Sequence, residues 1–183
     1  MKTNTHPHFY FATAAAVALV ITTIMTGCVT ASYHKSQAAA SSLQSAAADV
    51  QAEDRALDMT MASLNALVNK PPPVDLKLQY DVFSRNLDQL IDVTRRNDAA
   101  AQRVADTSTK YFANWDKEIL DMNYDAVRNL SASRKAEVTG KVDTLNRYYR
   151  DTQNTIRPVI DYFVDIRKAL STDLTLSGLE SVL

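Results

Sequence analysis

Few residues of this chain could take part in chemistry. The 183-residue sequence contains one Cys, three His and three Gly. A single Cys, Cys28, excludes an intrachain disulfide, and His34 is the only His after residue 8, so the sequence offers no set of zinc ligands. The glycines are too few for a phosphate-binding loop. The sequence therefore predicts no catalytic, metal-binding or cofactor-binding residue and no enzymatic activity.

Charged side chains are numerous but balanced. Lys and Arg number 20 against 21 Asp and Glu, which gives no electrostatic reason to expect nucleic acid as a partner. Four carboxylates are mixed with basic residues along one stretch, which favours a solvated surface over acid–base catalysis: Asp116, Glu118, Asp121 and Asp125. Two small basic clusters could touch lipid head groups or acidic glycans, or simply be surface charges: Arg95-Arg96 and Arg134-Lys135.

The N-terminal stretch has the pattern of a secretory signal. Lys2 precedes an uncharged run from Phe9 to Met25, and small residues follow this run. An uncleaved membrane helix is the alternative, although a run of this length is at the lower limit for a transmembrane span.

The uncharged run ends in Met25-Thr26-Gly27-Cys28, which resembles the lipobox of bacterial lipoproteins. The resemblance implies cleavage before Cys28 and attachment of palmitate-type acyl chains to this residue. It divides the chain into a signal peptide (1–27), an acylated Cys with a flexible tether (28–36) and a folded part (37–183). Val29, where an Asp would favour the inner membrane, implies the outer membrane, facing the periplasm. A free or buried thiol is the alternative for Cys28.

Hydrophobic periodicity predicts an all-α fold beyond the tether. The first helix is expected to end before Pro71-Pro72-Pro73, because proline cannot continue a helix. Its predicted apolar face comprises Leu43, Ala47, Val50, Leu57, Met61, Leu64 and Val68.

A second helix is predicted from Asp75 to a point between Met122 and Ser133. Positions at alternating spacings of four and three, as in a coiled coil, run from Leu76 to Met122. The apolar residues at these positions are Leu76, Tyr80, Phe83, Leu87, Leu90, Ala101, Val104, Tyr111, Trp115 and Met122. Thr94, Asn97 and Ser108 interrupt this pattern. We interpret them as local looseness or solvent access, in preference to control of the helix register by a buried Asn.

The third segment repeats the pattern at Val138, Val142, Leu145, Tyr149, Thr152, Ile156, Val159, Phe163, Ile166 and Leu170. Pro158 falls inside it, and a less regular tail with Gly178 follows. The three segments predict an elongated antiparallel three-helix bundle. The first helix is expected along the N-terminal part of the second, and the third along its C-terminal part.

These features resemble an uncharacterised family of bacterial envelope proteins, catalogued as domain of unknown function 2959. The matching residues after the lipobox are Tyr33, Phe112-x-x-Trp115-x-x-Glu118, Pro158-Val159, Phe163-x-Asp165, Leu170 and Leu174. The chain departs from the family at Ser171-Thr172-Asp173, where the family has a basic, His-containing stretch. The resemblance implies a fold and no particular activity.

Three classes of function follow from the sequence. The leading hypothesis is an envelope lipoprotein with a structural or protein-interaction role, held to a membrane through Cys28. Its partner would be another envelope protein or a second copy of the chain. The alternatives are a module that binds a membrane surface or an envelope polymer, and a chaperone or enzyme accessory subunit.

Overall fold

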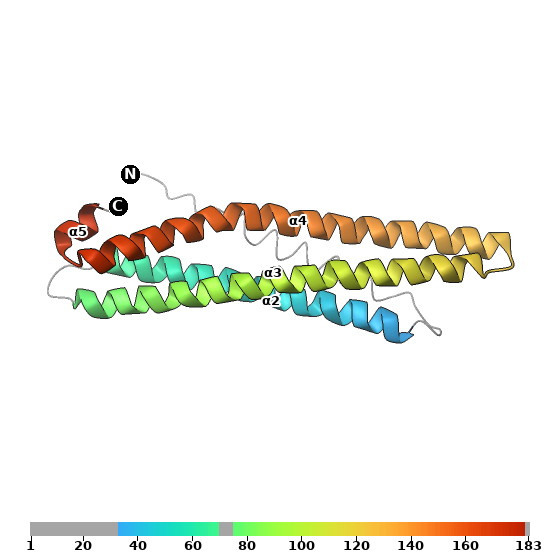
Figure 1. Ribbon diagram of the computed structural model, residues 1–183, viewed down its shortest axis with the longest axis horizontal. Helices are drawn as coiled ribbons and strands as arrows, with labels where there is room; N and C mark the ends of the chain where they lie inside the picture. Colours follow the sequence, from blue (N-terminus) through green and yellow to red (C-terminus); the bar gives the residue numbers. More distant parts are fainter. Residues whose placement is uncertain (1–32, 70–74, 182–183) are drawn as a thin grey trace, which may run out of the picture. The chain divides into compact units, whose positions relative to one another are not determined.

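The computed structural model describes residues 33–69 and 75–181, and the regular elements within them are all helices. In chain order these are α2 (Tyr33–Val68), α3 (Leu76–Leu120), α4 (Asp125–Thr172) and the short α5 (Leu176–Ser181) (Figure 1). The predicted all-α fold is therefore confirmed. The apolar run and the lipobox residues Met25, Thr26, Gly27 and Cys28 lie outside the described residues.

The first long helix starts earlier than expected. α2 begins at Tyr33, so residues 33–36, which were assigned to a flexible tether, are already helical. No Gly or Pro interrupts the stretch that follows, and Ala and Leu favour the helix. Near its C-terminal end, the amide of Asn69 still donates to the carbonyl oxygen of Asn65, 3.0 Å away. The helix thus stops just before the three prolines, as predicted.

Asp75 caps the N-terminus of α3. Its Oδ1 accepts hydrogen bonds from the backbone N–H groups of Lys77 at 3.0 Å and Leu78 at 3.3 Å. The helix ends at Leu120, two residues before Met122, which the sequence pattern had assigned to it. The predicted end, between Met122 and Ser133, is therefore two residues too late or more, and the turn to α4 begins before that interval.

α4 runs for 48 residues and continues through Pro158. Proline has no N–H group, so the carbonyl of Asn154 lacks its usual helical donor. Asn154 and Pro158 are both exposed, which allows water to satisfy this carbonyl.

The described residues form two compact units. Unit 1 comprises residues 33–50 of α2 and Asp98–Arg150, and unit 2 comprises Gln51–Asn97 and Asp151–Leu183. Each long helix therefore contributes to both units.

Unit 2 contains the main hydrophobic core. Its large buried side chains are Leu57, Leu67, Phe83, Leu87, Leu90, Val93, Ile156, Ile160, Phe163, Ile166, Leu170 and Leu179. The rings of Phe83 and Phe163 meet edge to face, with centroids 6.3 Å apart. Around them, Asn86 donates to the carbonyl oxygen of Met59, and Arg167 pairs with Asp88. These contacts join α2, α3 and α4 within this unit.

The path of α4 corrects the expected arrangement. In unit 2, the contacts of Phe163 with Phe83 and of Arg167 with Asp88 place α4 beside the N-terminal part of α3. In unit 1, Ser131 and Lys135 of α4 contact the C-terminal part of α3. The reason is length: α4 continues through Pro158 for 48 residues, so it contributes to both units.

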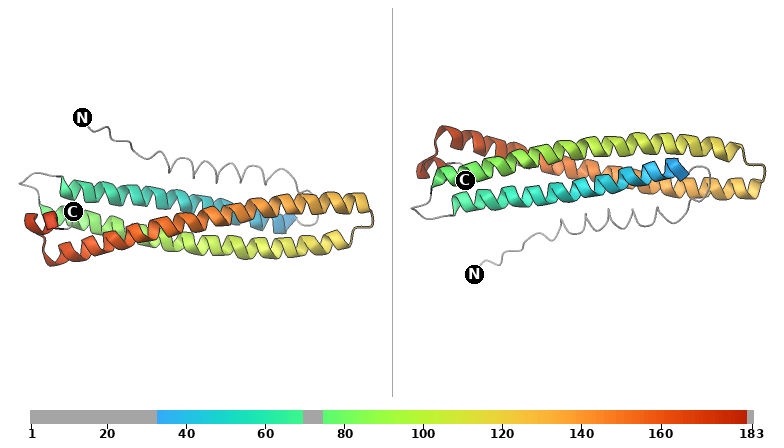
Figure 2. Two further views of the ribbon diagram at one scale, coloured as in Figure 1. Left: turned by 90° about the horizontal axis from the view of Figure 1, so that it is seen from above. Right: turned by 90° about the horizontal axis from the view of Figure 1, so that it is seen from below.

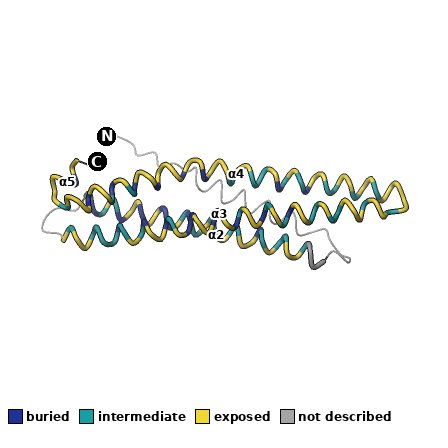
Figure 3. Tube along the Cα trace, in the orientation of Figure 1, coloured by how far each residue is buried: buried dark blue, intermediate teal, exposed yellow. Residues whose placement is uncertain are grey.

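Unit 1 has a smaller core. Its buried apolar residues are Leu43, Ala100, Val104, Val138 and Val142. Here α3 and α4 form an antiparallel hairpin, which Figure 2 shows from two sides. Figure 3 shows the turn of this hairpin as exposed, whereas buried residues are more frequent further from it.

The predicted apolar faces are shifted by one residue at several positions. On α2, Met61 is 53% exposed, whereas Thr60 and Ser63 are buried. On α4, Gln153 and Ile160 are buried in place of Thr152 and Val159. The other predicted positions of this part of α4, Ile156, Phe163, Ile166 and Leu170, are buried as expected. Packing against the other helices therefore decided, position by position, which of two adjacent residues is buried.

The last helix closes one end of the unit 2 core. Thr175 accepts a hydrogen bond from the amide of Gly178, and Leu179 is buried in the core. A Cβ atom on Gly178 would lie 2.2 Å from the carbonyl oxygen of Asp173. Only glycine allows this close approach of the backbone.

Candidate functional site

The carboxylates that the sequence assigned to a solvated surface are exposed in the structure, which confirms that interpretation. Asp116 pairs with Lys135 at 2.5 Å, and Asp125 pairs with Arg128 at 2.8 Å. Glu118 accepts a hydrogen bond from Asn114. These groups stabilise helices and link α3 to α4.

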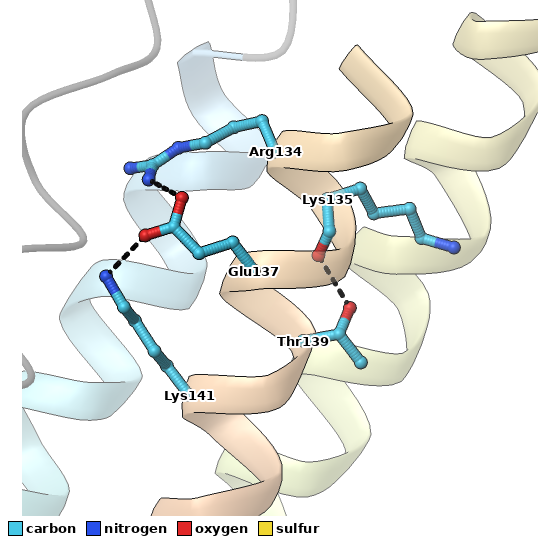
Figure 4. A network of polar contacts seen from close by, with 5 residues as sticks. All are labelled: Arg134, Lys135, Glu137, Thr139 and Lys141. Carbon is cyan, nitrogen blue, oxygen red and sulfur yellow. Dashed lines mark hydrogen bonds and ion pairs between the residues drawn. The ribbon is translucent and has the colours of Figure 1, made fainter. Parts of the chain in front are cut away.

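The small basic clusters also take part in ion pairs. Arg95 pairs with Asp92, and Arg134 lies 2.6 Å from a carboxylate oxygen of Glu137. Lys141 approaches the other oxygen of Glu137 at 2.7 Å (Figure 4). The hydrogen bond from Lys141, followed by that from Arg134, lowers the pKa of Glu137. Glu137 and Asp116 thus offset two of the three positive charges of Arg134, Lys135 and Lys141, which leaves a small net positive charge at this surface.

The exposed surface of the α3–α4 turn is unusually apolar. We call residues 120–130 the hairpin tip. Its large exposed apolar side chains are Leu120 (77%), Tyr124 (77%), Val127 (54%) and Leu130 (74%). Val127 and Leu130 are three residues apart on α4 and therefore lie about 60° apart around it, and Tyr124 directly precedes this helix. Isolated exposed apolar residues are common, but a group of them at one turn points to a contact surface.

Arg128 holds the hairpin tip in shape. Its guanidinium donates to the carbonyl oxygen of Met122 at 2.6 Å and to Asp125 at 2.8 Å. The side chain thereby satisfies a carbonyl at the end of α3 and positions the first turn of α4. Its charge is used inside the turn, while the apolar side chains around it face solvent.

Aromatic residues join the two helices behind the hairpin tip. The indole N–H of Trp115 donates to the Ser131 hydroxyl oxygen at 2.9 Å. The Trp115 ring meets that of Tyr111, with centroids 5.5 Å apart. Trp115 belongs to the Phe112-x-x-Trp115-x-x-Glu118 motif, whose place in the fold is thus the base of the hairpin tip. These contacts hold the base of the hairpin tip in a defined position.

A second unusual feature is a polar cluster buried in unit 2. Glu53 of α2, Asn97 of α3 and Gln153 of α4 are exposed by 3%, 1% and 3%. The Asn97 amide donates to the Glu53 carboxylate at 2.5 Å, and the Gln153 amide donates to it at 3.1 Å. One side chain from each long helix therefore meets at a single buried carboxylate.

This cluster corrects the interpretation of the polar interruptions. Asn97 is not accessible to solvent, and neither Thr94 nor Ser108 is exposed by more than 7%. The side-chain oxygens of Asn97 and Gln153 and the hydroxyl oxygen of Thr94 have no hydrogen-bond partner. A shift of one helix along the others would leave these buried polar groups without hydrogen bonds, which costs free energy. The network therefore favours one register of the three helices. The interpretation that we had placed second, register control by Asn97, fits this geometry.

Sequence reasoning missed two members of the cluster. Glu53 was not assigned to the apolar face of α2, and Gln153 lies next to Thr152, which was assigned to that of α4. The residues at 53, 60 and 67 on α2 are spaced by seven, which was the available indication. Polar side chains at two of the three positions concealed it.

Desolvation raises the pKa of the neighbouring Asp54, and the nearby Asp58 raises it further, against the effect of Arg55.

Two searches of residues 33–69 and 75–181 bear on membranes and metals. In this part of the chain, no helix combines the length and the apolar composition that crossing a bilayer requires. The same residues contain no group of three or more His, Cys, Asp or Glu side chains that could hold a metal ion.

The fold and these surfaces define an all-helical bundle protein with a polar cluster in its core and an apolar hairpin tip. The chain belongs to the family described as "Protein of unknown function (DUF2959)", which matches residues 28–182. The resemblance of the sequence to this family is thereby confirmed. No curated protein and no solved structure matched the chain.

Proposed function

We propose that the protein is a lipoprotein of the bacterial cell envelope, anchored by acyl chains on Cys28, with a structural or protein-interaction role and no enzymatic activity. The chain would be exported, cleaved after Gly27 and held at the outer membrane on the periplasmic side.

One observation carries this proposal. The only Cys of the chain directly follows Met25-Thr26-Gly27 at the end of an uncharged run. The family match begins at the same residue, Cys28, which is consistent with a mature protein that starts there. A thiol at this position is the group that lipoprotein acylation modifies, and the small residues before it would let a peptidase approach the backbone.

The energetics suit a permanent anchor. Each buried CH₂ group contributes about 0.8 kcal/mol, and a single acyl chain binds a membrane only marginally. Three chains, as the lipobox resemblance implies, would hold the protein in the bilayer for its lifetime. No membrane-spanning helix is needed in the folded part.

Substitution of Cys28 tests the anchor. In cells that express the full chain, Cys28→Ala should accumulate as an unprocessed precursor without acyl chains, as measured by intact mass and membrane fractionation. Thr26→Ser, which keeps a small residue in the lipobox, is the matched control and should be processed normally. An unchanged mature mass and unchanged membrane association in Cys28→Ala would refute the proposal.

The position after the anchor tests the location. Val29→Asp should move part of the lipidated protein from the outer to the inner membrane in an enteric-type host, as measured by density-gradient separation of the membranes. Recovery of the unsubstituted protein in the inner-membrane fraction, with the same distribution as Val29→Asp, would contradict the outer-membrane assignment while leaving the anchor intact.

Crosslinking in intact cells, followed by mass spectrometry, tests the interaction role. We expect crosslinks to another envelope protein or to a second copy of this chain. Crosslinks only within single chains, at cellular abundance, would contradict an interaction role.

A further inference from the structure

We propose that the hairpin tip contacts the lipid bilayer that holds the Cys28 anchor, with Leu120, Tyr124, Val127 and Leu130 at the membrane interface. This inference rests on the proposed function, because the anchor supplies the membrane. It adds a second contact between the folded part and the lipid.

The first argument is the exposure of these side chains. Leu120, Tyr124 and Leu130 each leave about three quarters of their surface in water, within eleven residues of one another. No described residue of unit 1 covers them, whereas the neighbouring Trp115 and Ser131 are partly buried between the two helices. The tip therefore leaves apolar surface in contact with water, and burial of this surface against an apolar partner would be favourable.

The second argument is the place where α2 begins. The first residues of α2 and the hairpin tip both belong to unit 1. Within this unit, both views of Figure 2 show α2 beginning on the side of the α3–α4 turn and stopping short of it.

The third argument is the length of chain between the anchor and α2. Cys28 precedes Tyr33 by five residues, which span at most about 17 Å when fully extended. The start of α2 is thus held close to the bilayer surface, on the side of unit 1 that carries the hairpin tip. The tip can reach the interface without any change in the fold.

The side chains of the tip favour a contact with lipid through apolar groups rather than through charge. Lys117 and Arg128 are balanced by Glu118, Asp121 and Asp125 around the turn, so net positive charge does not draw the tip to anionic lipids. Tyr124 has the amphipathic ring that is enriched at membrane–water interfaces. The contact is therefore shallow and independent of salt.

Fluorescence quenching in vesicles tests the contact. The full lipidated chain is reconstituted into phosphatidylcholine vesicles with and without brominated acyl chains. Trp115, the only Trp in the sequence, is first replaced by Phe, and a single Trp is then introduced as Tyr124→Trp. The matched control is Tyr148→Trp, which replaces a 54% exposed Tyr on α4 of the same unit. Circular dichroism confirms that each variant is folded.

Brominated lipid should quench roughly half of the Tyr124→Trp emission, as expected for a side chain at the headgroup–acyl boundary, and should leave the Tyr148→Trp emission unchanged. The quenching should persist in about 1 M salt, where charge interactions are screened beyond about 3 Å. Equal emission of the two variants in both vesicles, with the protein still membrane-bound, would overturn the contact but leave the anchor.

Two other outcomes are distinct. A blue-shifted Tyr124→Trp emission without quenching by bromine would show that a protein surface, such as a second copy, covers the tip, and would overturn the lipid contact. An unmodified Cys28 in protein isolated from cells would instead refute the proposed function. Intact mass separates this failure from a failure of the tip contact.

Discussion

Units 1 and 2 are built from the same three helices but differ in what those helices bury. Unit 2 encloses Phe83, Phe163 and many Leu and Ile side chains. Unit 1 buries mostly Val and Ala, and it leaves Leu120 and Leu130 exposed at its turn. The same helices are thus held by a filled apolar core in one unit and leave apolar side chains available for contact in the other.

The two units also differ in their polar contacts between helices. In unit 2, Asn97 and Gln153 surround the buried carboxylate of Glu53. In unit 1, the hydroxyl of Tyr149 donates to Asp98 at 2.9 Å, and both residues are only partly buried. Errors in helix register are therefore more costly in unit 2, where water cannot replace a lost partner.

The largest expected effect comes from the unit 2 core. Phe163→Ala should lower the free energy of unfolding by roughly 3–5 kcal/mol, because it leaves a cavity against Phe83. The matched variant in unit 1, Val142→Ala, should cost roughly 1–3 kcal/mol. Urea denaturation measures both. Equal losses would break the distinction between a filled and a sparse core.

The polar cluster should give the next largest effect. Asn97→Ala removes one of the two amide donors to the buried Glu53, and we expect a loss of roughly 1.5–3 kcal/mol. Gln102→Ala, an exposed amide on the same helix, should change stability by less than about 0.5 kcal/mol. In a Glu53→Leu background the cost of Asn97→Ala should shrink. An unchanged cost there would mean that the two side chains are not coupled.

Alanine substitutions of one glycine in each unit should change the stability of the protein in opposite directions. Gly178→Ala in unit 2 forces a Cβ against the Asp173 carbonyl oxygen and should destabilise the protein by roughly 1–3 kcal/mol. Gly140→Ala in unit 1 meets no atom within 4 Å and should stabilise α4 by roughly 0.5–1 kcal/mol. Thermal unfolding gives both signs. Destabilisation by Gly140→Ala would show that unit 1 is more tightly packed there than this geometry allows.

The smallest effect concerns Glu137 on the surface of unit 1. Hydrogen bonds from Lys141 and Arg134 lower its pKa from the ordinary value of 4.5, so the folded state favours the ionised carboxylate. Its contribution to stability is fully present above that value and is lost as the pH falls through the lowered pKa. Glu137→Gln should therefore lower Tm slightly at neutral pH and leave it unchanged in strong acid. High salt should also weaken the effect at neutral pH. A Tm difference that is constant with pH would mean that the ion pairs are not its cause.

The exposed residues of the fold were the hardest to predict. Val127 and Leu130 are of residue types that are usually buried. The sequence pattern gave no means to place the turn within the interval from Met122 to Ser133. Only when α3 ends at Leu120 and Arg128 bonds to the Met122 carbonyl oxygen does this stretch become a hairpin tip. The sequence-derived sites, Cys28 and the lipobox, lie outside the described residues and stay a prediction.

The amino-acid sequence was sufficient to predict the helical fold, the end of α2 and the start of α3. The 3.6-residue period of apolar side chains, the cap at Asp75 and the three prolines act locally, so they can be read along the chain. Tertiary packing decided which of two adjacent residues is buried, as at Ile160 instead of Val159, and brought Glu53, Asn97 and Gln153 together. Such choices depend on which side chains the other helices present, and residues far apart in a sequence carry no local mark of their contact.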